Sequence, residues 1–225
     1  MLESGAGSRE SVLPRSFYER GTLDVARDLI GKVLVHETGA GRAAGVIVET
    51  EAYIGEDDPA CHAAPGPTAR NAPLYGPPGI AYVYLNYGIH YLVNAVTESE
   101  GWPAAVLIRA LDPVEGIGLM RRRRARGSGR PAASFSDAEL CRGPGNLTKA
   151  LGIDLRQNLK DLTRSALRIE VDNRRSHIFN IEWSPRVGIT QAADRPWRCS
   201  VVGHAAVSGK RGGAALQGSR SYLPR

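Results

Sequence analysis

The 225 residues include 42% hydrophobic and 23% charged side chains, enough apolar material for one large domain, which excludes a wholly disordered chain. The 29 basic residues exceed the 23 acidic ones, and the whole excess lies in residues 121–130, which hold six arginines and no acid. A positive patch confined to one segment favours contact with an anion such as nucleic acid, although such a run is also typical of a solvated helix face.

Strands dominate the chain up to residue 111. Residues 22–30 have the apolar spacing of a helix and end at Gly31, a natural residue after a helix end. Residues 32–36 and 46–53 predict two strands. Residues 79–97 predict a β-hairpin with its turn at Asn86-Tyr87-Gly88, and residues 104–111 predict a further strand.

Helices dominate residues 113–163. Asp112-Pro113-Val114-Glu115 predicts a helix start with Asp112 as its cap, and this helix would carry the arginine run. A second capping box at 136–139 opens another helix, and residues 126–134 between them predict a mobile loop. Strands resume around 167–171 and 187–202. We expect one mixed α/β domain over residues 16–208, between flexible segments 1–15 and 209–225.

Two carboxylates lie two residues apart on the strand 46–53. Alternation places Glu49 and Glu51 on one face with Ile47 and Tyr53, about 6.6 Å apart. A solvated strand face would explain the pair. The neighbouring Ile47 and Tyr53 instead suggest a half-buried wall, where desolvation raises the pKa of a carboxyl and makes it a candidate general base.

The hairpin carries half of the eight tyrosines. Paired strand tyrosines usually pack within a sheet, but Tyr87 at the turn has little to pack against and is a plausible wedge between stacked bases. Arg109 interrupts an apolar run and therefore needs a buried partner. His62 is an ordinary loop histidine on its own. The residues of segments 76–79 and 143–146 favour turns, and neither segment matches a phosphate-binding fingerprint.

The cysteines Cys61, Cys141 and Cys199 stand too far apart for a CxxC pair, which favours free thiols over a zinc site or a disulfide framework. No window approaches the roughly 18 apolar residues of a membrane span, and the polar start has no signal-peptide core. We expect a soluble intracellular protein that is cytoplasmic, associated with the nucleoid in a prokaryote or nuclear in a eukaryote.

Several short segments between residues 16 and 208 follow one another in the order found in a known protein family. They are 48–53, 76–79, 82–88, Asn94, 107–111 with Pro113, 141–145, 150–153 and 186–189. With the spacing from Glu51 to His62, they resemble the alkyladenine (3-methyladenine) DNA glycosylases of the mammalian methylpurine type. The resemblance implies an antiparallel curved β core with a protruding hairpin and packed helices. It also implies a monomer that needs no metal or organic cofactor and acts on double-stranded DNA with damaged purines.

The resemblance implies a role for each candidate residue. Glu51 would be the general base that deprotonates water, while Tyr53, His62 and Tyr84 would enclose an extruded purine. Asn94 would reject the 2-amino group of guanine, and Tyr87 would fill the gap left in the duplex. Arg109 and the backbone near Val187 would hold the water or the phosphate of the flipped nucleotide. The substrates would be of the 3-methyladenine, 7-methylguanine and hypoxanthine class.

Lysine scarcity indicates the type of reaction. The four lysines, Lys32, Lys149, Lys160 and Lys210, all lie outside residues 33–148, whereas a glycosylase that also cuts the strand uses an amine. The sequence therefore predicts a monofunctional, water-using enzyme that starts base excision repair. Two alternatives stay open: a non-catalytic nucleic-acid-binding module in which Glu51 is structural, and a hydrolase of free nucleosides or other small glycosides.

Overall fold

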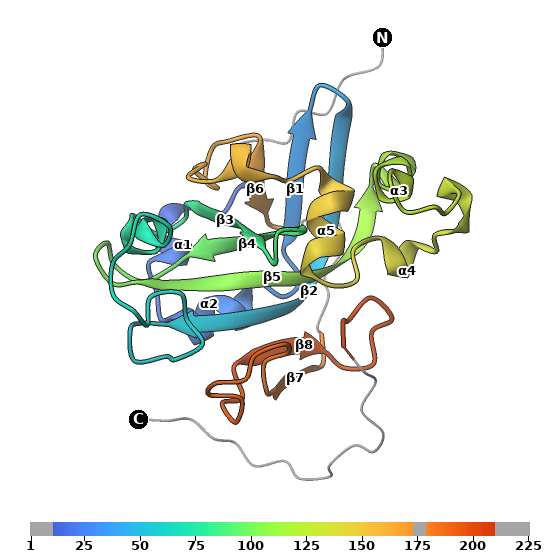
Figure 1. The fold of residues 1–225 in the computed structure, drawn as a ribbon. Coiled ribbons are helices and arrows are strands. Elements are labelled where there is room, and N and C mark those ends of the chain that lie inside the picture. Colours follow the sequence, from blue (N-terminus) through green and yellow to red (C-terminus); the bar gives the residue numbers. More distant parts are fainter. Residues whose placement is uncertain (1–10, 173–178, 210–225) are drawn as a thin grey trace.

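One antiparallel sheet forms the centre of the computed structural model, which describes residues 11–172 and 179–209 (Figure 1). Its strands follow the order β3-β4-β5-β2-β1-β6, while β8 pairs with β2 and β7 pairs with β8. The strands are β1 (Val33–Thr38), β2 (Gly41–Ile54), β3 (Ala81–Asn86), β4 (His90–Val96), β5 (Ala104–Glu115), β6 (Leu167–Glu170), β7 (Ile181–Ser184) and β8 (Arg198–Val201).

The long strand β2 organises the sheet. One edge pairs along its length with β5, and the other edge pairs first with β1 and then, at Glu49, with β8. The pairing of β2 with β5 skips Val48 on one strand and Arg109 on the other. Such bulges re-aim side chains, and they are frequent beside functional sites.

Because of the bulge at Val48, the predicted strand face is wrong for one residue, Ile47. Ile47 does not share a face with Glu49, Glu51 and Tyr53, because it packs in the main core with Ala52. The extra residue reverses the alternation between positions 47 and 49. The two carboxylates and Tyr53 stay on one side, as predicted, and an apolar neighbour is removed from it.

Helices close the sheet from several directions (Figure 1). Helix α2 is joined to β2 by the Thr50 hydroxyl, which donates to the carbonyl of Ala26 over 2.8 Å. Helix α5 packs on β4, where the Thr148 hydroxyl donates to the carbonyl of Tyr91 over 2.7 Å. The helices are α1 (Arg15–Tyr18), α2 (Thr22–Asp28), α3 (Ile117–Ala125), α4 (Asp137–Leu140) and α5 (Pro144–Leu151), with 3₁₀ turns at Ala72–Tyr75, Ala132–Ser134 and Leu155–Gln157.

The helix start predicted at Asp112 is wrong. Strand β5 continues to Glu115, because the first half of β2 pairs with it and places Asp112 opposite Val46. Helix α3 begins only after Gly116, which adopts a left-handed φ of +73°. The helix carries the arginine run, as predicted. Its predicted start is wrong because the pairing of β5 with β2 overrides the local capping signal at Asp112.

The remaining elements divide between confirmed and wrong predictions. The helix before Gly31, the hairpin and the capping box of α4 at Ser136 are confirmed. The segment 143–146 is not only a turn, because Pro144 opens α5 as its first residue. Of the strand predicted around 187–202, only β8 forms, and β7 lies earlier in the chain than expected.

The segment that leads into the expected domain pairs with the sheet edge at β6. Within the segment 1–15, the Leu13 N–H donates to the carbonyl of Ile169 over 2.9 Å and its side chain is buried. Residues 1–10 and 210–225 lie outside the described residues, so the domain boundaries remain predictions. The three cysteines are buried free thiols. Among residues 11–172 and 179–209, no helix has the length and apolarity to cross a membrane.

Gly116 gives a stability prediction. A Cβ there would lie 2.3 Å from the carbonyl oxygen of Arg42 in addition to the left-handed backbone. We expect Gly116→Ala to lower the free energy of unfolding by about 3 kcal/mol, measured by urea unfolding. Gly127→Ala is the matched control, because Gly127 has φ +70° with open space around it, and should cost only about 1 kcal/mol. Equal losses would contradict the close approach.

Candidate functional site

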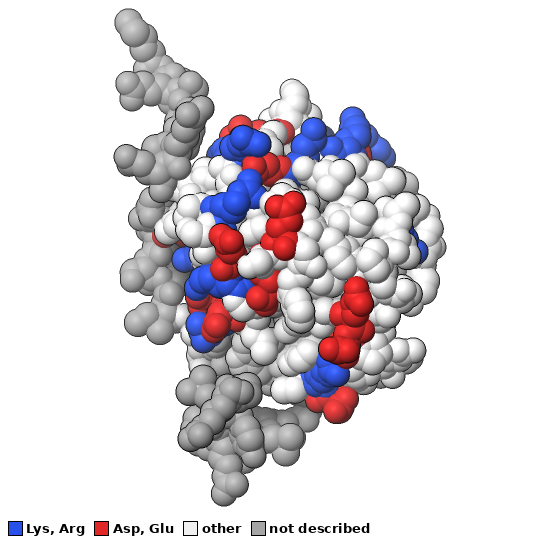
Figure 2. Space-filling model, turned by 90° about the vertical axis from the view of Figure 1, so that its left-hand side faces the viewer, with Lys and Arg blue, Asp and Glu red and all other residues white. Residues whose placement is uncertain are grey.

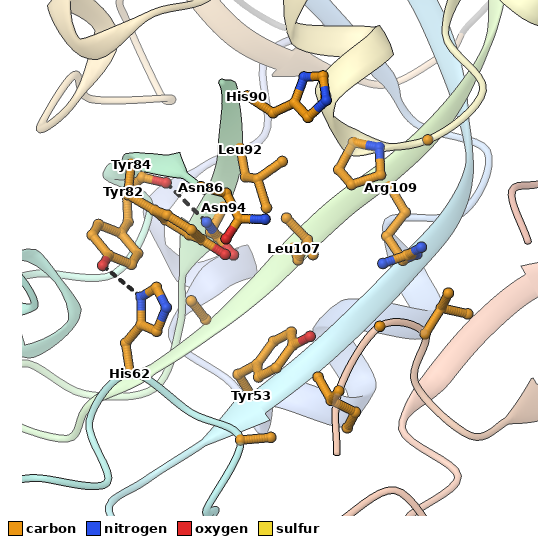
Figure 3. Close-up of a pocket in the computed structure, with 18 of the residues that line it drawn as sticks. Tyr53, His62, Tyr82, Tyr84, Asn86, His90, Leu92, Asn94, Leu107 and Arg109 are labelled. Atoms are coloured by element: carbon orange, nitrogen blue, oxygen red, sulfur yellow. Dashed lines mark hydrogen bonds between the residues drawn. The ribbon is translucent and has the colours of Figure 1, made fainter. Parts of the chain in front are cut away.

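A cavity of about 500 Å³ opens between β2, the β3–β4 hairpin, the start of α5 and the loop after β7. We call it the aromatic cavity. Figure 3 shows Tyr53 on one side of it and Tyr82, Tyr84 and Asn94 on the other, with Arg109 farther along. Further lining residues include His62, Asn86, Tyr87, His90, Leu92, Leu107, Gly145 and Val187.

One wall of the aromatic cavity is a packed trio of rings. The ring centres of His62 and Tyr84 lie 4.5 Å apart, edge to face, and those of Tyr82 and Tyr84 lie 5.2 Å apart. The Tyr82 hydroxyl and Nδ1 of His62 form a hydrogen bond of 2.8 Å. Burial, with a smaller contribution from Arg70, lowers the pKa of His62, so the imidazole is neutral at neutral pH. The wall is therefore uncharged and held together by ring contacts and a hydrogen bond.

Asn94 fixes a polar point in the cavity. Its Nδ2 donates to the carbonyl of Tyr82 over 3.0 Å, across the hairpin pair that sets these two residues opposite each other. No residue in the described part of the chain donates to its Oδ1. A buried amide held in one orientation presents that oxygen as an acceptor to whatever occupies the cavity.

Glu51 lies immediately beneath the cavity and is fully buried. Its Oε2 accepts hydrogen bonds from the Tyr53 hydroxyl (2.9 Å) and from Nη1 of Arg109 (3.0 Å). Its Oε1 accepts from the N–H of Val187 over 2.7 Å. All three donors line the aromatic cavity, although Glu51 itself does not. A group bound in the cavity would therefore be separated from this carboxylate only by its hydrogen-bond partners.

The environment of Glu51 suits a base. Burial raises the pKa of its carboxyl above the ordinary value, and Arg109, the Val187 N–H and the Tyr53 hydroxyl oppose this shift without cancelling it. The three donors favour the ionised form, while desolvation makes that form a better proton acceptor.

Glu49 holds the neighbouring arginine. Its Oε1 accepts from Nε of Arg109 (2.8 Å), Nε of Arg198 (2.7 Å) and the Ser208 hydroxyl (2.9 Å). Its Oε2 accepts from the N–H of Ser208 over 2.7 Å. Burial alone would raise the pKa of the Glu49 carboxyl, but Arg109, Arg198 and these hydrogen bonds outweigh it and lower that pKa. Glu49 thus accepts four hydrogen bonds, two of them from guanidinium groups, whereas Glu51 accepts three, only one of them from a guanidinium.

The tip of the hairpin stands out from the protein. Tyr87 is 85% exposed and occupies a left-handed backbone conformation with φ 48°, followed by Gly88 at φ 72°. Ile89 beside it is 73% exposed. An aromatic and an aliphatic side chain are thus exposed together at the hairpin tip, and Tyr87 also lines the aromatic cavity.

The arginine run does not form the free cationic patch that its charge suggested. Arg123 donates to the carbonyls of Ala150 and Leu151 and so caps the end of α5. Arg121 and Arg130 form ion pairs with acids of α4, and Arg124 bonds to Asn146, while Arg122 and Arg126 are exposed. On the face in Figure 2, basic side chains also alternate with acidic ones beside a broad uncharged area. Four of the six arginines thus serve the fold.

The predicted site residues come together almost completely. Tyr53, His62, Tyr84, Tyr87, Asn94, Arg109 and Val187 line one cavity, and Glu51 lies beneath it. Sequence reasoning missed Tyr82, Arg198 and Ser208; the last two are reached through strand pairing and a distant loop that no local pattern signals. Within the described ranges, no group of three His, Cys, Asp or Glu residues could hold a metal ion.

Comparisons with known proteins agree with this geometry. Residues 16–205 match a family model described as methylpurine-DNA glycosylase (MPG). A protein of Methanocella arvoryzae is 49% identical over 190 residues, covering 83% of this chain and 90% of its own length, and one of Rubrobacter xylanophilus is 49% identical over 176 residues, covering 78% and 86%. One of Chlorobium phaeobacteroides is 45% identical over 205 residues, covering 90% and 98%. Each carries the name "Putative 3-methyladenine DNA glycosylase".

The two carboxylates predict opposite effects on stability. A lowered pKa at Glu49 contributes stability that is present above the unfolded pKa of about 4.3 and is lost as pH falls through the folded pKa. The raised pKa of Glu51 has the reverse sign, so its ionised form opposes folding at neutral pH. We expect Glu49→Gln to lower the free energy of unfolding at pH 7 by about 3 kcal/mol.

Glu51→Gln is the matched comparison, and it should leave the free energy of unfolding unchanged or raise it by about 1 kcal/mol. Urea unfolding at pH 7 and pH 4 measures both variants. A destabilisation of equal size in the two would show that the environments of the carboxylates do not differ as described.

Proposed function

The chain belongs to the methylpurine-DNA glycosylase family and is a DNA glycosylase, a hydrolase of N-glycosyl bonds in DNA repair; on that premise we propose that it flips damaged purines out of duplex DNA and hydrolyses their bond to deoxyribose with Glu51 as general base. One observation carries the proposal. A fully buried carboxylate with three donors lies directly beneath a cavity with aromatic walls, and all three donors face that cavity.

The aromatic cavity would hold the extruded base. A purine stacked between Tyr53 and the rings of His62 and Tyr84 would bury both of its faces, and the electron-rich rings attract a base made cationic by alkylation. The backbone N–H of His62 has no hydrogen-bond partner within the described residues, so it can read the edge of the base. Asn94, fixed by Tyr82, would crowd the 2-amino group of guanine and so help to reject the normal purine.

Glu51 would act on the sugar carbon. Its Oε1 accepts only from Val187 in the described part of the chain, and a carboxylate oxygen can accept a second hydrogen bond, so a water entering between Arg109 and Val187 would find an acceptor for its proton. As the bond from C1′ to the base nitrogen breaks, C1′ gains oxocarbenium character that the carboxylate stabilises. The water oxygen bonds to C1′, its proton passes to Glu51, and the base leaves.

The chemistry of the leaving group would set the substrate range. Purines alkylated at N3 or N7 are already cationic and depart as neutral bases, as for 3-methyladenine and 7-methylguanine. Hypoxanthine is neutral and needs a proton from elsewhere, and the described residues that line the cavity include no acid for this task. We therefore propose that the alkylated class is the better substrate and hypoxanthine the poorer one.

The hairpin would open the duplex. Flipping costs a few kcal/mol of lost stacking and pairing, and it is easiest at damaged or mispaired bases. Tyr87 stands at the rim of the cavity with most of its ring exposed, so it can enter the stack as the base leaves it. Among the described residues, no lysine lines the aromatic cavity, which supports a water-using reaction that leaves an abasic site. The enzyme would act as a monomer, where chromosomal DNA lies.

The proposed base predicts a loss of activity without a loss of binding. We expect Glu51→Gln to slow release of 7-methylguanine from alkylated duplex DNA by about 10²- to 10⁴-fold, because the attacking water loses its proton acceptor. Affinity for the same duplex should change little. Base release is measured by chromatography in a single turnover, with Glu182→Gln, an exposed carboxylate on β7, as control.

Equal base release by the parent and Glu51→Gln would remove Glu51 from its role. A parent that releases no base but binds duplex DNA would favour the non-catalytic binding module, and release from free nucleosides alone would favour a small-glycoside hydrolase.

The hairpin predicts a separate defect. We expect Tyr87→Ala to weaken capture of the flipped base, so that the affinity for a duplex with a damaged purine falls about ten-fold, by the value of one stacked ring. Fluorescence anisotropy with matched damaged and undamaged duplexes measures it. Trp102→Ala is the control, because Trp102 is also exposed but does not line the aromatic cavity. An unchanged preference for damaged duplex in Tyr87→Ala would contradict the wedge.

A further inference from the structure

We propose that the buried ion pair of Arg186 and Asp58 is a positioning pair that fixes the walls of the aromatic cavity relative to Glu51. This inference rests on the proposed function, because it concerns residues that act through the proposed base and base-binding groups. Neither residue lines the aromatic cavity, and both side chains are completely buried.

The pair has the geometry of a clamp. Nη1 of Arg186 donates to Oδ2 of Asp58 over 2.5 Å, and Nη2 donates to Oδ1 over 2.8 Å, so the two planar groups meet through two parallel bonds. Nη1 also donates to the carbonyl of Ala52, on β2 between Glu51 and Tyr53, over 2.9 Å. A forked guanidinium specifies direction as well as distance, which a lysine cannot do.

On one side, the clamp holds the groups next to Glu51. Val187 directly follows Arg186, and its N–H is the donor to Oε1 of Glu51. The Arg186 guanidinium also lies 4.6 Å from the ring centre of Tyr53, whose hydroxyl donates to Oε2 of the same carboxylate. Two of the three donors to Glu51 are thus placed by a single side chain.

On the other side, the clamp holds the turn that carries His62. The Asp58 carboxylate accepts from the N–H of Ala60 (3.2 Å) and of Ile54 (3.4 Å), and the Asp58 carbonyl accepts from the N–H of Cys61 (2.8 Å). His62 follows within this turn. The ion pair therefore joins the segment bearing one face of the base slot to the segment bearing the donor of Glu51, although the two lie far apart in sequence.

A purely structural pair would stabilise the fold and leave the site unchanged. The placement here is more specific. Arg186 bonds to the carbonyl of Ala52, next to Glu51, Asp58 accepts from the N–H of Ile54 three residues along from Glu51, and neither partner lines the cavity. The charged and titratable groups around Glu51 are Arg109 from β5, Glu49 and Tyr53 from β2, Tyr84 from β3 and Arg186 itself. Any shift of Val187 or Tyr53 changes the donors of that set.

The test uses Arg186→Lys, which keeps the positive charge opposite Asp58 but loses the fork. Asp58→Asn is the second variant and covers the case in which Arg186→Lys does not fold. Arg195→Lys is the matched control. Arg195 also lies near Asp58 (3.7 Å) and, like Arg186, stacks on Trp197, but it is partly exposed and does not contact Tyr53 or Ala52. Urea unfolding verifies that each variant is folded.

Three readouts are expected to move in the variants of the pair and not in Arg195→Lys. The single-turnover rate of 7-methylguanine release falls about ten-fold or more, while affinity for alkylated duplex DNA changes less than about three-fold. The acidic limb of the pH–rate profile moves to higher pH, because a carboxylate that loses a donor is protonated more easily. The amide hydrogen of Val187 exchanges faster with solvent, because its acceptor is no longer held opposite it.

A folded variant with the parent rate and the parent exchange at Val187 overturns the proposal. A slower variant in which Val187 exchanges as in the parent overturns it as well, since the loss then does not pass through that amide. A parent that releases no base counts against the proposed function instead, and the exchange of Val187 still decides the role of the pair.

Discussion

The structure depends on burying four charged side chains side by side. Glu49, Glu51, Arg109 and Arg198 meet where β2 pairs with both β5 and β8, and their two negative and two positive charges balance. A buried carboxylate without partners would be prohibitively costly, so the two carboxylates depend on the two guanidinium groups beside them. The bulges at Val48 and Arg109 turn the side chains toward one another, and both carboxylates are completely buried there.

Within that cluster, the carboxyl groups of Glu49 and Glu51 are chemically identical but have different surroundings. Glu49 accepts from two guanidinium groups and from Ser208, and its pKa is lowered; Glu51 has fewer donors and deeper desolvation, and its pKa is raised. When the environments of two carboxyls push their pKa values apart, one becomes a fixed charge and the other a proton acceptor. The proposed chemistry therefore follows from the number of donors around each oxygen, and not from the identity of the residue.

Much of the fold and most of the site could be predicted from the sequence, for different reasons. Strand periodicity and turn residues located the hairpin, and the need of a buried arginine for a partner pointed to Arg109. The family resemblance located the other cavity residues. The helix start at Asp112 and the face of Ile47 were wrong because long-range pairing with β2 overrode local signals. Arg198, Ser208 and the partner of Asp58 could not be found, since their contacts join segments more than a hundred residues apart.

The bond from Ser208 to Glu49 has a consequence for how the protein is made. The ribosome delivers β2 and β5 long before it delivers β8 and the loop that follows it, so a nascent chain carries two carboxylates and a single guanidinium with their remaining partners still unsynthesised. The charge-balanced cluster therefore cannot close until almost the whole described region has been synthesised.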